Sequence, residues 1–378
     1  MCARFLWTGA IESSRGAKVA WSTVCLPKSE GGLGLRSFSK WNKTLCMRFI
    51  WLLFSDNVTL WSLWHKHHYI RGASFWNLKE NATSSASWNS ILRLRPEAKH
   101  FINVVLGNGL KASFWFDAWT PMGPLIDAIG EQGPRNLRIE RNATVASACP
   151  SGTWNIPQPR SEAVVKLHSY LTTIPVPSIS MQDDYYTWTV DSNVYTGFNA
   201  SKTWEALRPR APPKNWAPSV WFKGSIPRHA FNMWVTHLDR LPTRSRLASW
   251  GIITSTDCCL CGREPETRDH LFLKCCYSVQ LWISALQKID PRPHHFQSWS
   301  EVLSWTRNDS NRAPALLRKI VAHSTIYHIW RERNSVLHNG THIPHQVTSK
   351  AIYREVINTI TARKQRKHFQ SFMSLWLR

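Results

Sequence analysis

The stretch "CCLCGREPETRDHLFLKCC", Cys258–Cys276, contains five cysteines and one histidine. Zinc prefers thiolate and imidazole ligands in a tetrahedron, and two ligands at C-x₂-C spacing can share one tight turn around the ion. Within the stretch only Cys258 and Cys261 have this spacing, and Gly262 follows them to permit the turn. Towards the other end, a histidine and a cysteine lie five residues apart. The predicted zinc ligands are therefore Cys258, Cys261, His270 and Cys275.

The other two cysteines of the stretch, Cys259 and Cys276, are expected to be spectators, or alternates if the register slips by one. Four protein ligands leave no open position for water, so we expect one structural zinc ion and not a catalytic one. Leu271 and Phe272, between the ligands, are expected to point into a core. The alternative interpretation is a set of scattered buried thiols without metal.

Composition indicates a soluble, basic, folded protein. The chain has 378 residues, 43% of them hydrophobic, which is enough to bury a core. It has 47 Lys and Arg against 24 Asp and Glu, a formal net charge of +23. Such an imbalance usually indicates a polyanionic partner, and nucleic acid is the commonest polyanion. The alternative is a basic protein without a specific partner.

No segment is typical of secretion or membrane insertion. The N-terminal residues lack a basic region followed by a long apolar one, and the apolar run Phe49–Phe54 is far shorter than the roughly 18–20 residues that span a bilayer. We expect an intracellular protein of the nucleus or cytoplasm, without a membrane partner. Its cysteines are then expected to be free thiols or metal ligands.

Helices are predicted at two places in the first third of the chain. After Ser37 the apolar residues Trp41, Leu45, Phe49 and Leu52 recur at helical spacing and predict one buried face. A second helix is predicted over 89–105. The segment 107–119, "GNGLKASFWFDAW", is expected to be a turn followed by a short strand.

A small amount of β-structure is predicted further along. Alternation in "YYTWTV" and a turn at Asp191–Asn193 predict a β-hairpin. Asp183 and Asp184, which precede it, are expected to be a solvated strand start.

A compact helical module surrounds the cysteines. Pro227 is expected in the first turn of one helix, and Thr243 is expected to cap a second, whose Leu247 and Trp250 face inward. A third helix is predicted over 279–286. The last segment is helical and basic, with twelve Lys and Arg against two Glu from Arg312 onward.

Together these elements predict a mainly α fold with a small β-hairpin, of class α+β. The fold comprises a helical zinc-knuckle module, a loop-rich linker and a basic helical C-terminal segment. Four segments are predicted, at 1–120, 121–180, 181–290 and 291–378.

Several motifs carry a family resemblance. "LPT" lies between two helices of the module, "CLCG" is followed by "ET", and "HLFLKC" closes the knuckle. With "VAWSTVCLPKSEGGLGLRSFSKWN", "GNGLKASFWFDAW" and "IWRERNSVLHNG", this series resembles the zinc-binding domain of plant LINE-type (non-LTR) retrotransposon reverse transcriptases, together with the region that follows their polymerase thumb. The resemblance implies 1–120 as the post-thumb remnant, 121–180 as the linker, 181–290 as the zinc-binding domain and 291–378 as the basic tail.

Catalytic motifs of that family are not recognisable in this sequence. The family polymerase uses a Y-x-D-D turn to hold magnesium, whereas this chain has "DDYY" at Asp183–Tyr186. No endonuclease segment and no run of carboxylates for a ribonuclease H is apparent. The resemblance therefore implies a truncated, non-catalytic retroelement protein.

Three functions are considered. The first is binding of RNA or single-stranded DNA through bases near the knuckle, with Arg228, Arg244, Arg246, Arg263, Arg268 and Lys274 as candidate contacts. The second is a zinc-stapled docking or scaffold module, which could bind the polymerase domain in trans, or a relic without function. The third, a nuclease, lacks clustered carboxylates. The apolar helices of the first third are expected to leave an exposed hydrophobic patch.

Overall fold

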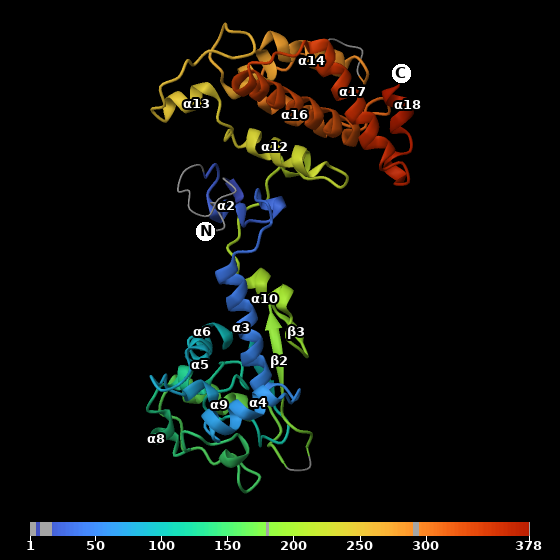
Figure 1. Ribbon diagram of the computed structural model, residues 1–378. Coiled ribbons are helices and arrows are strands. Elements are labelled where there is room, and N and C mark those ends of the chain that lie inside the picture. The colour runs from blue at the N-terminus through green and yellow to red at the C-terminus, as the bar shows by residue number, and fades with distance from the viewer. Residues whose placement is uncertain (1–4, 8–16, 179–180, 290–294, 378) are drawn as a thin grey trace. The chain divides into compact units, whose positions relative to one another are not determined.

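The computed structural model describes residues 5–7, 17–178, 181–289 and 295–377. The chain divides into two compact units (Figure 1). The sheet unit is Arg36–Pro209, and the zinc unit combines Met1–Leu35 with Arg210–Arg378. Most described elements are helices, and the described strands form one three-stranded antiparallel sheet. The predicted mainly α fold with a little β-structure is confirmed.

The sheet unit contains most of the short elements of the chain. In order they are α3 (Phe38–Phe54), α4 (Leu60–His65), η2 (Lys66–Ile70), η3 (Phe75–Asn77), α5 (Ala86–Leu92), α6 (Arg95–Ala98), β1 (Ile102–Val105), α7 (Leu125–Ile129), α8 (Gly133–Leu137), η4 (Ala146–Ala148), α9 (Glu162–Leu171), β2 (Tyr185–Val190), β3 (Asn193–Tyr195) and α10 (Ala200–Leu207).

The sheet has the strand order β1–β2–β3. Val190 of β2 pairs with Asn193 of β3 across a two-residue turn in which both central residues have positive φ, as in a type I′ turn. The predicted hairpin is confirmed. The helix predicted over 89–105 is wrong in its second half, because 102–105 form β1 and pair with β2. A short apolar run does not distinguish strand from helix until its partner strand is known.

Helix α3 begins after Ser37 as predicted, but the predicted buried face is wrong. Leu45 and Phe49 are 40% and 41% exposed, whereas Met47 and Ile50 are fully buried. The helix carries apolar residues on more than one side, so spacing alone does not choose the face. Met47 and Ile50 lie in the core of the sheet unit, and α5 and α10 are among the elements that pack against α3.

The loop at 107–119 is organised by a buried carboxylate and not by a strand. Asp184 is 1% exposed, and its two oxygens accept hydrogen bonds of 2.7–3.0 Å from the backbone N–H groups of Gly107, Gly109, Lys111 and Ala112. The prediction of a solvated strand start is therefore wrong for Asp184. Asp183 does lie at the surface, where it pairs with Lys111 at 2.9 Å.

The segment 121–180, predicted as a loop-rich linker, contributes to the core of the sheet unit. Its short helices α7, α8 and α9 alternate with loops, and Leu125 and Leu167 are fully buried. The segment is therefore rich in loops but packed.

The named elements described in the zinc unit are all helices. Its elements are α2 (Trp21–Val24), η1 (Lys28–Glu30), α11 (Ala217–Val220), α12 (Pro227–His237), α13 (Arg244–Ser249), η5 (His270–Lys274), α14 (Cys276–Leu286), α15 (Trp299–Arg307), α16 (Ala315–Asn339), α17 (His345–Thr361), η6 (Lys367–Phe369) and α18 (Phe372–Trp376). The long helix α16 packs against α12, α14, α15 and α17 (Figure 1).

Two of the three helices predicted around the cysteines begin as expected. Pro227 is the first residue of α12, where its missing N–H is tolerated, and Thr243 precedes α13. The inward orientation predicted for Trp250 is wrong, because α13 ends before it and its side chain is 53% exposed. The third helix is α14, which begins at Cys276 and buries Trp282.

The early segment 27–35, "PKSEGGLGL", packs onto α12. The indole Nε1 of Trp234 donates to the carbonyl oxygen of Gly31 at 2.9 Å, and the Ala211 N–H donates to Glu30 at 2.9 Å. Gly31 and Gly34 have φ of 98° and 77°, which glycine adopts without strain. Residues far apart in the sequence therefore share one core. Within the described residues, every helix is too short or too polar to cross a membrane.

Candidate metal centre

The four predicted ligands lie together in the zinc unit. Their ligand atoms, three Sγ atoms and one imidazole nitrogen, are all within 4.8 Å of one another. The Sγ atoms of Cys258 and Cys275 are 3.9 Å apart, and Cys261 Sγ is 3.3 Å from His270 Nε2. Zinc–sulfur bonds of about 2.3 Å at tetrahedral angles place two sulfurs roughly 3.8 Å apart. The separations fit one zinc ion at the centre of the cluster.

The first pair of ligands is held by a tight turn. The Gly262 N–H donates to the carbonyl oxygen of Cys258 at 2.7 Å, and the Cys258 N–H donates to that of Glu264 at 2.7 Å. Gly262 has φ of 65°, a conformation that a side chain would disfavour. The turn therefore requires the glycine that follows the C-x₂-C pair.

The second pair is held by a single π-helical turn, η5. A π-helix closes its hydrogen bonds between residues five apart, and the Cys275 N–H donates to the carbonyl oxygen of His270 at 2.7 Å. This geometry places a histidine and a cysteine at x₄ spacing on one side of the turn. Leu271 and Phe272 between them are fully buried, as predicted. The carbonyl of Phe272 accepts a hydrogen bond from Trp282 Nε1 at 2.8 Å.

Glu264 orients the histidine ligand. Its Oε2 lies 2.9 Å from Nδ1 of His270, and Nε2 of the same ring faces Cys261. A carboxylate that accepts from Nδ1–H fixes the tautomer that presents Nε2 to a metal. Glu264 is thus a supporting residue of the site and not a ligand.

The thiols differ in their acidity. The contact with the Cys275 thiol, at 3.9 Å between the two Sγ atoms, lowers the pKa of Cys258 to about 5. By contrast, burial and the neighbouring Glu266 raise the pKa of Cys259 to about 12. Cys259 donates to Glu266 Oε2 at 3.3 Å, and Cys276 is exposed. Neither of the two belongs to the described cluster of ligand atoms.

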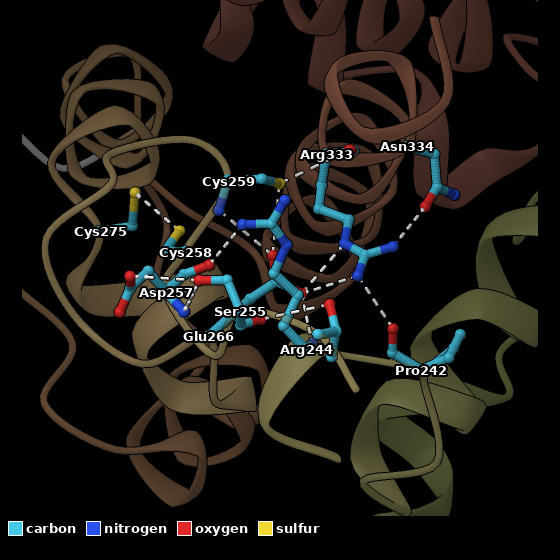
Figure 2. A network of polar contacts seen from close by, with 11 residues as sticks. Pro242, Arg244, Ser255, Asp257, Cys258, Cys259, Glu266, Cys275, Arg333 and Asn334 are labelled. Atoms are coloured by element: carbon cyan, nitrogen blue, oxygen red, sulfur yellow. Dashed lines mark hydrogen bonds and ion pairs between the residues drawn. The ribbon is translucent and has the colours of Figure 1, made fainter. Parts of the chain in front are cut away.

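A buried ion pair joins the knuckle, residues 258–275, to α16. Glu266 and Arg333 are 0% and 1% exposed. One carboxylate oxygen of Glu266 accepts from Nε and Nη2 of Arg333 at 3.0 and 2.8 Å, and from the Arg244 N–H at 2.9 Å (Figure 2). Nη2 of Arg333 also donates to the carbonyl of Pro242 at 3.0 Å. The pair therefore links three segments around the zinc centre.

The structure separates the six predicted contact bases into two groups. Arg244, Arg246 and Arg268 are partly buried and bind protein groups, namely the carbonyl oxygens of Asp257, Asp239 and His237 respectively. The second group is exposed and comprises Arg228, Arg263 and Lys274, of which Arg228 pairs with Glu355 at 2.8 Å. Arg263 and Lys274 lie beside the ligands Cys261 and Cys275, whereas Arg228 lies in the first turn of α12.

Sequence reasoning missed Glu264, Glu266 and Arg333 as supporting residues. The sequence contains "ET" and "IWRERN" as family motifs, but without the fold nothing in it indicates that Glu266 meets Arg333. The only local signal was a carboxylate three residues after the C-x₂-C pair, at Glu264.

The fold and the cluster of ligands define a class of module, a helical domain with a structural zinc site. Residues 198–282 match the protein family described as zinc-binding in reverse transcriptase, so the chain contains a zinc-binding domain of this type. A protein of Arabidopsis thaliana named "Putative ribonuclease H protein" is 24% identical over 288 residues, which cover 74% of this chain and 46% of that protein. The chain thus spans about half the length of this curated relative. No solved structure matches.

Proposed function

We propose that the chain is a non-catalytic protein of retroelement origin that binds RNA or single-stranded DNA through its zinc unit. The observation that carries the proposal is the distribution of charge. The zinc unit has 29 Lys and Arg against 12 Asp and Glu, a net charge of +17 out of the +23 of the whole chain. Phosphate contacts supply most of the sequence-independent affinity for nucleic acid.

The role assigned to zinc is structural. Three cysteines and one histidine fill a tetrahedron and leave no position for a reacting water. The ion would hold the C-x₂-C turn against η5, and Glu266 would hold both against α16. Arg263 and Lys274 would thereby be fixed at the surface beside the ion.

Trp250 offers a stacking platform in the same unit. Its ring is 53% exposed, and the Arg246 guanidinium lies 5.3 Å from its centroid. Exposed aromatic rings stack on unpaired bases and contribute about 1–3 kcal/mol per base. This feature favours single-stranded over duplex nucleic acid.

A non-catalytic role is proposed because three carboxylates of the zinc unit, two of them buried and one partly buried, already serve the fold. Glu266 binds Arg333, Glu332 accepts from the Ile343 N–H at 2.6 Å, and Glu355 binds Arg228 and two histidines. A two-metal nuclease needs carboxylates free to hold its ions. The relative's printed name makes ribonuclease H activity the specific alternative.

Binding is tested by fluorescence anisotropy with a labelled 20-nucleotide RNA, the same DNA sequence and its duplex. We expect submicromolar binding of the single strands near 100 mM salt. The logarithm of the affinity should fall with the logarithm of salt concentration with a slope of about −2 or steeper, as for three or more phosphate contacts. Absence of binding at 20 mM salt would refute the proposal. An RNA–DNA hybrid incubated with Mg²⁺ should stay intact, and its cleavage would make the protein a nuclease.

A docking function is the second candidate, and the sheet unit carries the observation that favours it. Leu60, Leu63 and Trp64 of α4 are each at least 50% exposed. Exposed apolar residues that cluster on one element mark interaction surfaces. This face could bind another protein, such as a polymerase domain in trans, while the zinc unit binds nucleic acid.

A further inference from the structure

A basic groove lies between α12, α16 and α17 of the zinc unit. It has a volume of about 690 Å³, in the range of ligand-binding clefts. Four arginines line it, one from α12, one from α16, one from α17 and one that follows α17: Arg228, Arg331, Arg354 and Arg363. Only Arg228 belongs to the contacts predicted from the sequence.

Glu355 anchors the three helices at the groove. Its carboxylate accepts from Nη2 of Arg228 at 2.8 Å, lies 3.2 Å from Nε2 of His229, and accepts from Nε2 of His328 at 2.7 Å. Burial alone would raise the pKa of Glu355, but the hydrogen bonds from His229 and His328 outweigh it and lower this pKa. The ionised Glu355 thus joins α12 and α16 to α17, and the groove is built before any ligand arrives.

The positive charge of the groove is only partly compensated. Glu355 is the one carboxylate among the residues that line it, and Arg228 already pairs with it. Among the described residues, Arg331, Arg354 and Arg363 form no ion pair with a carboxylate, and Arg331 and Arg354 are exposed. Arg363 is partly buried and donates from Nη1 to the Thr359 carbonyl at 3.1 Å, which leaves its charge without a carboxylate partner. Three guanidinium groups thus face one groove with uncompensated charge, and guanidinium geometry suits phosphate oxygens.

The aromatic ring of the groove is already covered. His229 stacks on Tyr327 with ring centroids 4.3 Å apart, and the guanidinium of Arg228 lies 5.2 Å from the Tyr327 centroid. These contacts leave the ring little free face for a nucleobase. The groove therefore suits the backbone of a nucleic acid better than its bases.

From this geometry we infer that the α12–α16–α17 groove binds the phosphodiester backbone of a single-stranded nucleic acid, through Arg331, Arg354 and Arg363. The inference rests on the proposed function and gives it a location. Contact is made to phosphates and carries no sequence preference. Bases remain outside the groove and are free to stack elsewhere.

The test compares two triple variants with the wild-type chain, by anisotropy with the labelled 20-nucleotide RNA. The groove variant is Arg331→Gln, Arg354→Gln, Arg363→Gln. The control is Lys79→Gln, Arg135→Gln, Arg160→Gln, which removes the same charge from exposed positions of the sheet unit. We expect the groove variant to lose at least tenfold in affinity at 100 mM salt. The slope of the logarithm of affinity against the logarithm of salt concentration should become shallower by about 2, because each lost phosphate contact removes about 0.7. The control should change affinity less than threefold.

Each other outcome is decisive. If the wild-type chain binds and both variants lose affinity equally, net charge and not the groove is responsible for binding. The inference about the groove is then refuted, while the proposed function stands. If the wild-type chain does not bind, both proposals fail. If a polyglutamate peptide of equal charge displaces the RNA as well as unlabelled RNA does, the groove takes acidic protein segments and the inference is wrong.

Folding is checked by the melting temperature and zinc content of each variant. If the groove variant is unfolded, the single exposed substitution Arg354→Gln replaces it. That substitution should make the salt slope shallower by about 0.7 and leave the zinc content unchanged. An unchanged slope would again refute the groove.

Discussion

Arg333 of α16 donates two hydrogen bonds to one oxygen of Glu266, 67 residues earlier in the chain. The contact closes the zinc knuckle against the longest helix of the structure. Both side chains are fully buried, so each charge depends on the other for its compensation. The zinc centre is therefore one part of a larger polar framework.

We predict that Arg333→Met lowers the free energy of unfolding by about 3–5 kcal/mol, because it leaves a buried carboxylate without its partner. The matched control is Arg93→Met, which removes the exposed Arg93–Glu80 pair of the sheet unit and should change that free energy by less than about 1 kcal/mol. Urea unfolding curves of the two variants measure the difference. Equal midpoints would show that the Glu266–Arg333 pair does not support the fold.

The neighbouring residues Asp183 and Asp184 provide a second comparison. Asp184→Asn replaces one of two oxygens that each accept two backbone N–H groups, and we expect a loss of about 3 kcal/mol in the free energy of unfolding. Asp183→Asn alters an exposed pair with Lys111 and a hydrogen bond from Asn108 Nδ2, which an amide oxygen can still accept, and should cost less than about 1 kcal/mol. The same unfolding experiment compares them. Similar values for both would mean that Asp184 does not organise the loop 107–119.

The buried histidine His323 should make the free energy of unfolding depend on pH. Its ring is 2% exposed, Nε2 donates to the Ser219 carbonyl at 2.9 Å, and burial lowers its pKa to about 3. The unfolded chain binds a proton at this histidine below about pH 6.5, whereas the folded chain does not. The contribution of neutral His323 to the free energy of unfolding is therefore complete above pH 6.5 and is lost as the pH falls towards 3. Between pH 6 and pH 5 the loss is about 1 kcal/mol.

The variant His323→Gln isolates this effect, because its amide can still donate to Ser219 but does not titrate. Zinc release in acid affects both proteins alike, so the difference between their unfolding free energies reports on His323 alone. We expect the wild-type protein to lose more stability than the variant on acidification. Parallel pH profiles would contradict the prediction.

Local patterns in the sequence predicted the local parts of the structure. The C-x₂-C spacing with Gly262, the hairpin at Asp191, and Pro227 at the start of α12 each depend on neighbours within a few residues. The same holds for His270 and Cys275, although the π-turn that joins them was not foreseen. The four ligands could therefore be named without a structure.

Features that depend on distant partners could not be predicted. The buried face of α3 depends on the distant segments that pack against the helix, and β1 is a strand because β2 pairs with it. Asp184 is buried because a loop some 75 residues earlier needs acceptors for its N–H groups. Arg333 resembled any other base of a basic helix until the fold placed Glu266 against it.

The account depends most on the closed zinc site, and zinc content measures it directly. Elemental analysis of purified protein should find one zinc ion per chain. The ion should be lost in the Cys258→Ser, Cys261→Ser double variant and retained in Cys276→Ser, which changes an exposed thiol outside the cluster. Loss of zinc should also lower the melting temperature, because a structural ion contributes to folding. Zinc retained by the double variant, or its absence from the wild-type chain, would contradict the account.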